Sequence, residues 1–370
     1  MRIGIDIRSV LKKQKTGIGY YTLNIINSLA RLDGQNRYFL YSRKRLFSSS
    51  KKLPLLPGVN FKHRVDYLGL GPGLTLRKAC DVFHTSGFDL RPPKGAKFIV
   101  TVHDIIPFVF PQGHTTDAIE RLKAQLPLAL AAADRVIVDA QNTAADLIHF
   151  YPDIQKDKIR LVYPGAGDDF GVLAKDTKNL YKEMFLKYNI RSNYIIYIGT
   201  IEPRKNLKGL IKAYHSLKKA HEIIQQLVIS GMKGWESEPV FRLVDELQLE
   251  KDVVFTGYVP RDHLKVFYNF ADICVYPSFY EGAGLPVLEA FKCGCPVVTS
   301  NVSCMPEFAG EAAVLVNPHD IDSIAAGIWS ILSSETLRSR LAGAGFKRAA
   351  AFTWENTARN MLNIFKEVAG

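Results

Sequence analysis

Short apolar segments alternate with longer amphipathic segments along most of this 370-residue sequence. Segments 2–7, 97–104 and 135–140 are rich in Val and Ile, as buried strands are, and helical patterns follow them. Alternation of this kind favours parallel strand pairing, because each helix carries the chain back along one face of the sheet. We therefore predict an α/β fold in which helices cover both faces of mainly parallel sheets.

The alternation stops once, between residues 164 and 193, where the sequence is irregular and polar. It then restarts, which predicts two doubly wound, Rossmann-like domains. Ligands of such sheets bind beyond the carboxyl ends of the strands, so two domains that face each other would enclose a deep cleft. The predicted parts are a first domain at 1–170, a second domain at 171–352 and a C-terminal helix at 353–370.

The last segment has the pattern of a one-sided helix. Thr353 suits its N-cap position. Apolar residues recur behind it at helical spacing, namely Trp354, Ala358, Met361, Leu362 and Phe365. A helix that is apolar along one side has to pack against another part of the protein.

The composition, 47% hydrophobic and 23% charged, is typical of a globular protein. No apolar run approaches the roughly 18–20 residues that a transmembrane helix needs. A strand pattern begins at residue 2, so we expect no signal peptide. The five cysteines lack the paired spacing of a zinc site. We therefore expect a reduced, cytoplasmic protein.

Positive charge is concentrated at the start of the chain. The first hundred residues hold 19 Lys and Arg against 5 Asp and no Glu, whereas the other 270 hold 29 cationic and 31 acidic residues. Such a basic lobe suits an anionic membrane, a nucleic acid or a phosphorylated acceptor, and a basic surface that serves only solubility is an equal alternative. Segment 42–57 mixes Lys and Arg with Phe and Leu, which favours peripheral contact with a lipid surface. Because no nucleic-acid-binding motif is present, we expect no nucleic-acid partner.

The segment GTIEPRKNLKGLI (199–211) follows a strand pattern and opens a helix. Arg204 and Lys205 lie just before the helix N-terminus, where free backbone N–H groups also attract anions. The guanidinium fork and the lysine charge suit phosphate oxygens. Two solvated loop charges are the alternative, but Gly199 and Pro203 shape this loop at a strand's carboxyl end, which favours a phosphate site.

The segment EGAGLPVLE places two carboxylates around a glycine-rich turn. Glu281 ends the loop after a strand pattern, and Glu289 falls about one turn into the next helix, with Pro286 at its first position. Gly282 and Gly284 lack Cβ atoms, which would let a ligand approach the backbone closely. A hydrolase that uses both glutamates is an alternative, but they would have to flank one glycosidic bond at roughly 5 Å or 6.5–9.5 Å, which a loop-and-helix placement disfavours.

Weaker signals lie in the first half of the chain. His103 ends a strand pattern, where a lone histidine is more often structural than catalytic. Gly17 and Gly19 form a GxG sequence that lacks the third glycine of GxGxxG, so this is weak evidence for a phosphate site. Asp6 and Arg8 are polar candidates without an assigned role.

Together these segments resemble the family-4 retaining glycosyltransferases, which have the GT-B fold. The resemblance spans essentially the whole chain and is carried by TGIGYY, TVHDIIPFVFP, GTIEPRKNL, SGMKGW, FTGYVP, FTWENTA and, most specifically, the E-x7-E segment EGAGLPVLE. In that family the last helix crosses back onto the first domain, which would give segment 353–370 its partner. The resemblance also implies that residues 1–170 bind the acceptor and residues 171–352 the nucleotide-sugar donor.

The resemblance implies a role for each candidate residue. Arg204 and Lys205 would hold the donor diphosphate and stabilise the leaving group, and Glu289 would bind the ribose hydroxyls. Glu281 would contact the donor sugar, and His103 would reach it from the first domain. The positions whose backbone would contact the donor are Gly17, Gly19, Tyr258, Val259, Gly282, Ala283, Gly284 and Leu285.

Two fixed cations beside a departing diphosphate supply electrostatic catalysis, so we expect no metal cofactor. No DxD-type pair ends a strand pattern, and the nearest sequence, GDDF (167–170), falls between the predicted domains. The resemblance implies that the anomeric configuration is retained and that a donor phosphate oxygen takes the proton of the acceptor.

The segments HDIIPFVFP, GTIEPRKN and SGMKGW look most like those of bacterial mannosyltransferases in surface-polysaccharide assembly. The expected donor is GDP-mannose, and the expected acceptor is a glycan or a lipid-diphosphate-linked sugar at the inner membrane face. UDP-glucose, UDP-N-acetylglucosamine and UDP-galactose stay open, because no residue separates guanine from uracil. A nucleotide-sugar epimerase of the same fold and a basic nucleic-acid-binding protein are weaker alternatives, disfavoured by the FTWENTA segment and by the lack of base-stacking motifs.

Overall fold

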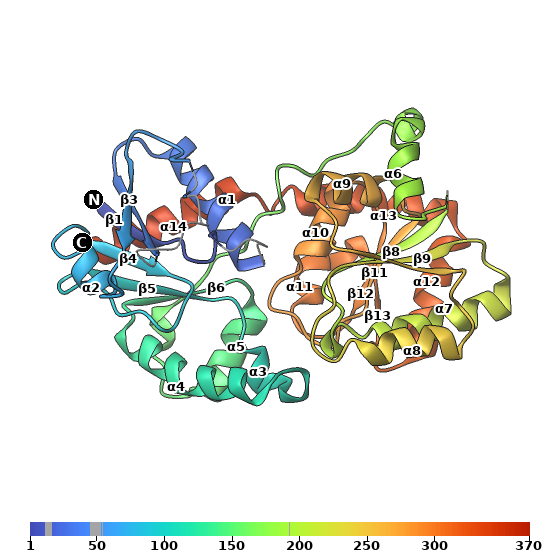
Figure 1. The fold of residues 1–370 in the computed structure, drawn as a ribbon, viewed down its shortest axis with the longest axis horizontal. Helices are drawn as coiled ribbons and strands as arrows, with labels where there is room; N and C mark the ends of the chain where they lie inside the picture. The colour runs from blue at the N-terminus through green and yellow to red at the C-terminus, as the bar shows by residue number, and fades with distance from the viewer. Residues whose placement is uncertain (12–16, 45–52, 54, 192) are drawn as a thin grey trace. The chain divides into compact units, whose positions relative to one another are not determined.

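The computed structural model describes residues 1–370 except 12–16, 45–52, 54 and 192. The chain forms two compact units (Figure 1). The first unit comprises residues 1–109, 115–165 and 353–370, and the second comprises 110–114 and 166–352. The boundary in the chain thus falls between residues 165 and 166, so residues 166–170 belong to the second unit, whereas the sequence analysis assigned them to the first domain.

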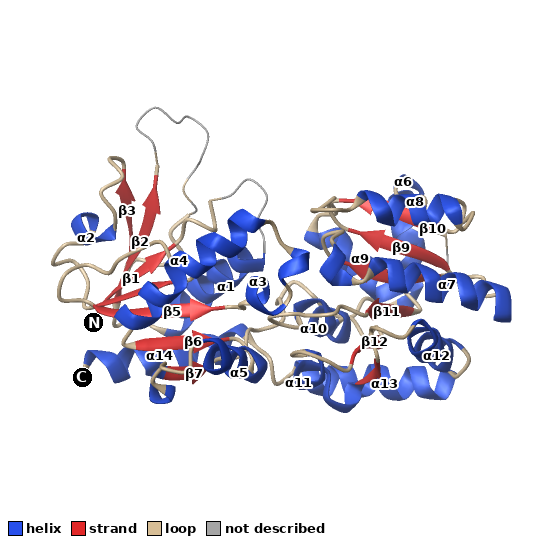
Figure 2. Cartoon of the chain, turned by 90° about the horizontal axis from the view of Figure 1, so that it is seen from below, coloured by secondary structure: helices blue, strands red, loops and turns tan. Residues whose placement is uncertain are grey.

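The first unit is built on a seven-stranded parallel sheet in the order β3-β2-β1-β4-β5-β6-β7 (Figure 2). The strand order changes direction between β1 and β4, and their carboxyl ends form the edge at which doubly wound sheets bind ligands. The strands are β1 (Arg2–Asp6), β2 (Arg37–Arg43), β3 (Phe61–Asp66), β4 (Val82–Thr85), β5 (Lys97–Val102), β6 (Arg135–Val138) and β7 (Ile159–Leu161).

Helices cover both faces of this sheet, as the alternating pattern predicted. Its apolar residues form two buried clusters, one that includes α1 and α14 and one that includes α4. The helices are α1 (Gly17–Leu32), α2 (Pro72–Thr75), α3 (Ile106–Val109), α4 (Thr116–Ala132), α5 (Gln141–Phe150) and α14 (Trp354–Ala369), with a 3₁₀ turn η2 (Lys156–Lys158).

Helix α14 packs beside α1, which confirms the predicted return of the C-terminal helix to the first domain (Figure 1). Thr353 caps it by accepting a hydrogen bond from the backbone N–H of Asn356 at 3.1 Å. Trp354, Met361 and Phe365 are buried in the cluster that α1 shares. Full burial of one such side chain stabilises the fold by about 1.5–3 kcal/mol, so the helix is an integral part of the first unit.

The second unit holds a six-stranded parallel sheet in the order β10-β9-β8-β11-β12-β13. Its strand order changes direction between β8 and β11. The strands are β8 (Tyr194–Ile198), β9 (Gln226–Ser230), β10 (Val253–Gly257), β11 (Ile273–Tyr276), β12 (Val297–Ser300) and β13 (Ala313–Val316). Its helices are α6 (Lys182–Lys187), α7 (Leu207–His221), α8 (Glu238–Glu246), α9 (Arg261–Phe270), α10 (Leu285–Lys292), α11 (Met305–Ala309), α12 (Ile321–Leu332) and α13 (Glu335–Ala349), with 3₁₀ turns η1 (Pro111–Gly113), η3 (Lys175–Tyr181), η4 (Pro203–Lys205) and η5 (Gly310–Ala312).

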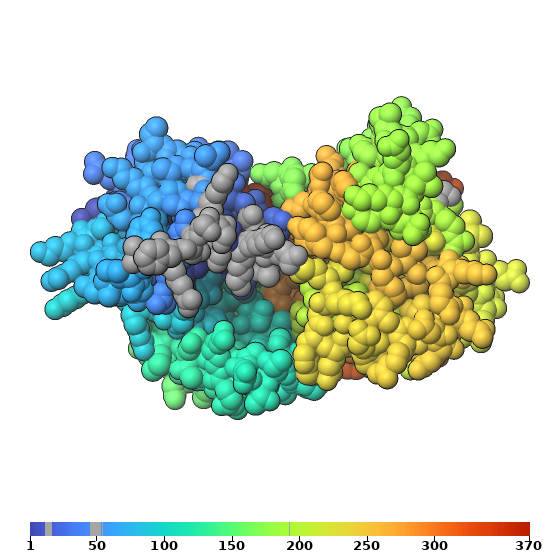
Figure 3. Space-filling model, in the orientation of Figure 1, coloured from blue at the N-terminus to red at the C-terminus, as the bar shows by residue number. Residues whose placement is uncertain are grey.

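Helix α8, yellow in Figure 3, lies on the surface of the second unit, whereas α10 packs against β11 and β12. All five cysteines are buried and unpaired. Within the described residues, no helix is both long enough and apolar enough to cross a bilayer.

Candidate functional site

The candidate residues of the second unit follow β8 and β11, the two strands at which the sheet order changes direction. The loop after β8 carries Arg204 and Lys205, and the loop after β11 carries Glu281. Because parallel strands end at the same edge, these loops lie side by side. The backbone N–H of Phe279 donates to the carbonyl of Arg204 at 2.9 Å, which joins the two loops directly.

Arg204 and Lys205 both bind the Glu281 carboxylate. Arg204 Nη1 lies 2.7 Å from Glu281 Oε2, and Lys205 Nζ lies 2.6 Å from Oε1. Lys205 also donates to the Tyr276 hydroxyl at 2.5 Å, and Arg204 Nη2 pairs with Glu202 at 2.6 Å. The two side chains are therefore held by carboxylates, and they lie together on one loop as the sequence predicted.

Burial would by itself raise the pKa of the Glu281 carboxyl, but the charges of Arg204 and Lys205 outweigh it and lower the pKa to about 2. Glu281 is thus an anion at every physiological pH. The same anion raises the pKa of Arg204 further, so its guanidinium stays charged despite burial. Arg204 and Glu281 are therefore fixed charges, and a fixed cation is what electrostatic stabilisation of a developing anion requires. Burial lowers the pKa of Lys205, although the Glu281 charge opposes this shift.

Asn206 shapes the loop after β8. It has the left-handed backbone conformation (φ 55°) and directly precedes α7. Its side-chain amide is buried and donates to the carbonyls of Pro277 and Pro318 at 3.1 and 2.6 Å. A short polar side chain tolerates this conformation best, so Asn206 both turns the chain and ties three loops together.

Glu289 occupies a different environment from Glu281. It lies in the second turn of α10, is 9% exposed, and accepts a hydrogen bond from Arg261 Nη1 at 3.1 Å. The Tyr268 hydroxyl lies 3.5 Å from its other oxygen. Burial raises the pKa of Glu289 to about 7, because one arginine does not fully offset the lost solvation. The two glutamates of the E-x7-E segment therefore differ widely in acidity, as carboxylates with distinct tasks do.

The glycine-rich turn differs from its prediction in two respects. Helix α10 begins at Leu285, so Pro286 is its second residue and not its first. Gly284 has a negative φ (−88°), and a Cβ there would lie 2.9 Å from the Phe308 side chain. Packing against Phe308 is thus a structural reason for this glycine, separate from close approach of a ligand. The remaining residues of the turn, Gly282 and Ala283, lie in the loop between Glu281 and this helix.

Tyr258 and Val259 follow β10 at the same edge of the second sheet. Val259 is buried, whereas Tyr258 is 49% exposed. Gly257 before them has a left-handed φ of 68°, which turns the chain at the end of the strand. Backbone contact with a base at this turn stays a prediction.

In the first unit, Gly17 and Gly19 lie in the first turn of α1, which begins at Gly17. Gly19 is buried and Gly17 is exposed, with open space where a Cβ would be. Thr16, the first residue of the TGIGYY segment, lies outside the described residues.

His103, which follows β5, is partly buried and pairs with the buried Asp139, which follows β6. The Nδ1 atom of His103 lies 2.6 Å from Asp139 Oδ2. Burial opposes the charged imidazole, but the Asp139 charge prevails and raises the pKa of His103. The Tyr21 ring packs edge-on against the imidazole, with centroids 4.6 Å apart. His103 also borders a cavity of about 360 Å³ in the first unit, together with Asp104 and Arg121.

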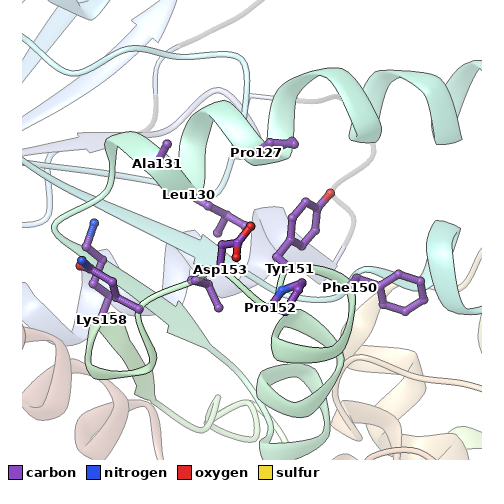
Figure 4. Close-up of a pocket in the computed structure, with 10 residues that line it drawn as sticks. Pro127, Leu130, Ala131, Phe150, Tyr151, Pro152, Asp153 and Lys158 are labelled. Carbon is purple, nitrogen blue, oxygen red and sulfur yellow. The ribbon is translucent and has the colours of Figure 1, made fainter.

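The first unit has a second cavity, of about 450 Å³, between α4 and the end of α5 (Figure 4). It is lined by apolar side chains such as Leu130 and Phe150, with Asp153 and Lys158 at its side. None of the predicted site residues borders it.

Several partners of the predicted residues were not predicted, namely Asp139, Glu202, Arg261 and Tyr276, and neither was the pairing of Arg261 with Asp169. A signal existed for Asp139: Val102 and Val138 are register partners on neighbouring strands, so the residues after them fall side by side. Arg261 and Asp169 had no such signal, because a loop and a helix bring them together from distant parts of the second unit.

Several exposed apolar residues of the first unit lie in the segment that follows β3 and includes α2. Tyr67, Leu68, Leu70 and Leu74 are each more than half exposed, and Arg77 and Lys78 beside them are exposed too. We call residues 67–78 the 67–78 surface. Most of the basic part of segment 42–57, including Lys51 and Lys52, lies outside the described residues.

Among the described residues, no group of three or more His, Cys, Asp or Glu side chains is arranged to hold a metal ion. Asp168 and Asp169 of the GDDF sequence pair instead with Lys292 and Arg261, at 3.8 and 2.7 Å.

Comparison with known proteins agrees with the two-part architecture. The family model described as "Glycosyltransferase Family 4" matches residues 15–170, and the one described as "Glycosyl transferases group 1" matches residues 181–348. The O-antigen chain mannosyltransferase B of Escherichia coli is 33% identical over 286 residues, which is 77% of this chain and 74% of that protein.

The serotype-specific mannosyltransferase WbdA of Escherichia coli is 30% identical over 272 residues, 73% of this chain but only 33% of WbdA. Among solved structures, sucrose-phosphate synthase from Thermosynechococcus elongatus superposes with a TM-score of 0.78 at 22% identity, and the match covers 99% of this chain and 98% of that one. At this identity the likeness shows the fold alone, which is the GT-B fold.

Proposed function

Because the chain belongs to the family-4 glycosyltransferases, with a group 1 glycosyltransferase domain in its second half, we propose that it transfers mannose from GDP-mannose to a glycan or lipid-linked acceptor in the assembly of a bacterial surface polysaccharide. The names of two relatives, an O-antigen chain mannosyltransferase and a serotype-specific mannosyltransferase, support this choice of sugar and pathway. A UDP-sugar donor is the alternative that the experiment below separates.

The observation that carries the proposal is the buried cluster of Arg204, Lys205 and Glu281 at the switch point of the second sheet. Cleavage of a glycosyl–phosphate bond leaves negative charge on a diphosphate. A guanidinium and an ammonium fixed in a poorly solvated site stabilise that charge as it develops. In this role Arg204 and Lys205 bind the diphosphate, and Glu281 holds the two cations in place.

We propose that the reaction needs no metal cofactor and retains the anomeric configuration. Two fixed cations supply the charge that a divalent ion supplies in metal-dependent transferases. The acceptor attacks from the side on which the diphosphate leaves, and a phosphate oxygen of the departing donor takes its proton. Glu289 binds the ribose hydroxyls through its carboxylate, and His103 donates a hydrogen bond to the sugar.

We propose that the first unit binds the acceptor and contacts an anionic membrane peripherally. The 67–78 surface supports this contact, because exposed leucines beside Arg77 and Lys78 suit a bilayer interface that carries negative charge. The excess of cations in the first hundred residues supports it as well.

Thermal unfolding with a panel of nucleotide sugars tests the donor. A ligand at 100 times its dissociation constant stabilises the native state by about 2.7 kcal/mol, which is a readily measured rise in Tm. We expect GDP-mannose to raise Tm and UDP-glucose, UDP-N-acetylglucosamine and UDP-galactose to leave it unchanged. If only a UDP-sugar raised Tm, that UDP-sugar and not GDP-mannose would be the donor. If no nucleotide sugar changed Tm, the proposed function would be overturned.

A further inference from the structure

The Arg261 side chain lies between two carboxylates of the second unit. Its Nε and Nη2 atoms bind Asp169 at 2.7 and 3.0 Å, and its Nη1 atom binds Glu289 at 3.1 Å. The guanidinium therefore donates two parallel hydrogen bonds to Asp169, and its remaining nitrogen donates one to Glu289. Such a bidentate pair fixes the plane of the guanidinium, and with it the direction of the third bond.

The segment around Asp169 is built to receive this arginine. The Arg261 guanidinium lies over the Phe170 ring, 4.6 Å from its centroid, which adds a cation–π attraction. A Cβ on Gly167 would lie 2.5 Å from Arg261 Nη2 and 2.3 Å from Asp169 Oδ1, so only a glycine fits without displacing them. Lys292 Nζ donates to the carbonyl of Gly167 at 3.0 Å and anchors the same segment on α10.

Glu289 depends on this arginine for its charge. Burial raises its pKa, Arg261 lowers it, and the nearby Asp169 charge raises it again, with a net pKa of about 7. The other titratable groups facing Glu289 are Tyr268, whose hydroxyl lies 3.5 Å away, and the buried Cys274 and Cys293. Arg261 thus donates a hydrogen bond to Glu289 and lowers its pKa, and the Asp169 charge opposes this effect.

We propose that Arg261 is a positioning residue that keeps Glu289 charged and correctly oriented. Asp169 and Phe170 hold the Arg261 side chain in place beside Glu289. Through Glu289, these three residues set the affinity for the ribose diol of the donor nucleotide. The inference rests on the proposed function, because it takes Glu289 as the ribose-binding residue.

The chemistry behind the proposal is simple. A charged carboxylate accepts hydrogen bonds from two neighbouring hydroxyl groups, and such bonds are about twice as strong as those between neutral groups. A protonated carboxyl offers one weak acceptor and one donor in place of two strong acceptors. Without Arg261, a buried Glu289 would therefore be largely neutral near pH 7 and would lose its preference for a diol.

The test measures the ribose preference directly. The dissociation constants of GDP and 2′,3′-dideoxy-GDP are determined by calorimetry between pH 6 and 9, with UDP and its dideoxy analogue in parallel. The ratio of the two constants cancels the titration of the phosphates and reports the diol alone. The variants are Arg261→Gln, Arg261→Lys, Asp169→Asn and Glu289→Gln.

The ribose preference is the dissociation constant of the dideoxy analogue divided by that of the parent nucleotide. In the wild type we expect this ratio to be half of its alkaline limit near pH 7, which is the midpoint, and to increase above that pH. In Arg261→Gln the midpoint moves to higher pH, so that the preference at pH 7.5 falls roughly threefold if the pKa of Glu289 rises by about one unit. In Asp169→Asn the amide oxygen still accepts a hydrogen bond from Arg261 and keeps it beside Glu289, so the loss of the opposing charge moves the midpoint to lower pH. Arg261→Lys restores most of the wild-type midpoint.

The midpoint should therefore move in opposite directions in Arg261→Gln and Asp169→Asn. A merely structural role of these residues would lower the affinity for the nucleotide at every pH without moving the midpoint. Arg242 is exposed on α8, and Arg242→Gln is the matched control for loss of one positive charge. If Glu289→Gln leaves the ribose preference intact, the proposed role of Glu289 fails. If Glu289→Gln abolishes the preference but the midpoints in Arg261→Gln and wild type coincide, the present inference alone is overturned.

Discussion

Lys205 and Glu281 form a buried ion pair, with 2.6 Å between Nζ and Oε1, at the point where the order of the second sheet changes direction. Because Arg204 binds the other carboxylate oxygen, neither cation can be removed without leaving charge unpaired in a poorly solvated place.

Replacing Lys205 by alanine should nearly abolish transfer. Loss of one fixed charge that stabilises the transition state typically lowers kcat by about 10²–10³-fold, because the leaving diphosphate loses a strong contact. Steady-state rates and the dissociation constant of the donor's nucleoside diphosphate measure the effect. Lys212→Ala, on the exposed side of α7, is the control and should behave as wild type. Unchanged turnover in Lys205→Ala would remove the diphosphate site from this cluster.

Glu281 should give the protein an acid-sensitive component of stability. Its pKa falls from an ordinary 4.5 to about 2 on folding, so the stabilisation is complete above about pH 4.5 and is lost as the pH falls toward 2. The shift corresponds to about 3 kcal/mol of unfolding free energy. In Glu281→Gln we expect lower stability at neutral pH and a difference from wild type that shrinks between pH 4.5 and 2. Urea unfolding across this range is the measurement, and a difference independent of pH would contradict the assignment.

His103 should titrate at higher pH than an ordinary histidine because of Asp139. A histidine with a raised pKa contributes stability below about pH 6.5 that is lost as the pH rises through the folded-state value. If His103 donates a hydrogen bond to the donor sugar, the alkaline limb of the kcat/KM profile reports the same pKa. We expect Asp139→Asn to move that limb to lower pH. Proton NMR of the Nδ1–H, with His84→Gln to exclude the other buried histidine nearby, follows the pair independently of activity.

The elements of this fold were predictable because their signals are local. The periodic pattern of Trp354, Met361 and Phe365 needed a partner, and α1 provides it in the same buried cluster. The pairing of Arg204 and Lys205 on one loop was also visible, since the two residues are adjacent in the chain. That Glu281 binds both of them depends on β8 and β11 being neighbours in the sheet, which the strand patterns by themselves did not determine.

The reasons for some residues could not be predicted, because they depend on packing. Gly284 was interpreted as an opening for ligand, whereas the Phe308 side chain also occupies the place of its missing Cβ. The difference in pKa between Glu281 and Glu289 could likewise not be predicted from the sequence. Two cations surround the Glu281 carboxylate, whereas Glu289 has one arginine that it shares with Asp169.

Transfer should not depend on a divalent ion. Arg204 and Lys205 already supply two positive charges beside Glu281. We expect the rate with the donor identified by thermal unfolding to be the same in EDTA as in Mg²⁺ or Mn²⁺. A rate that EDTA abolishes and Mg²⁺ restores would overturn the proposal of metal independence, while leaving the donor assignment in place.

The 67–78 surface should bind anionic bilayers through both its apolar and its basic residues. In cosedimentation with vesicles of phosphatidylglycerol and phosphatidylethanolamine, we expect the wild-type protein to bind and to be released by salt, because screening weakens the attraction of Arg77 and Lys78. Leu68→Asp with Leu70→Asp should prevent binding even at low salt, since two exposed apolar contacts become negative charges. Leu180→Asp with Leu186→Asp changes two exposed leucines of the second unit in the same way and should bind as wild type. Equal loss of vesicle binding in both double variants would show that net charge, and not the 67–78 surface, governs the association. Binding that does not change with salt would rule out a contribution from Arg77 and Lys78.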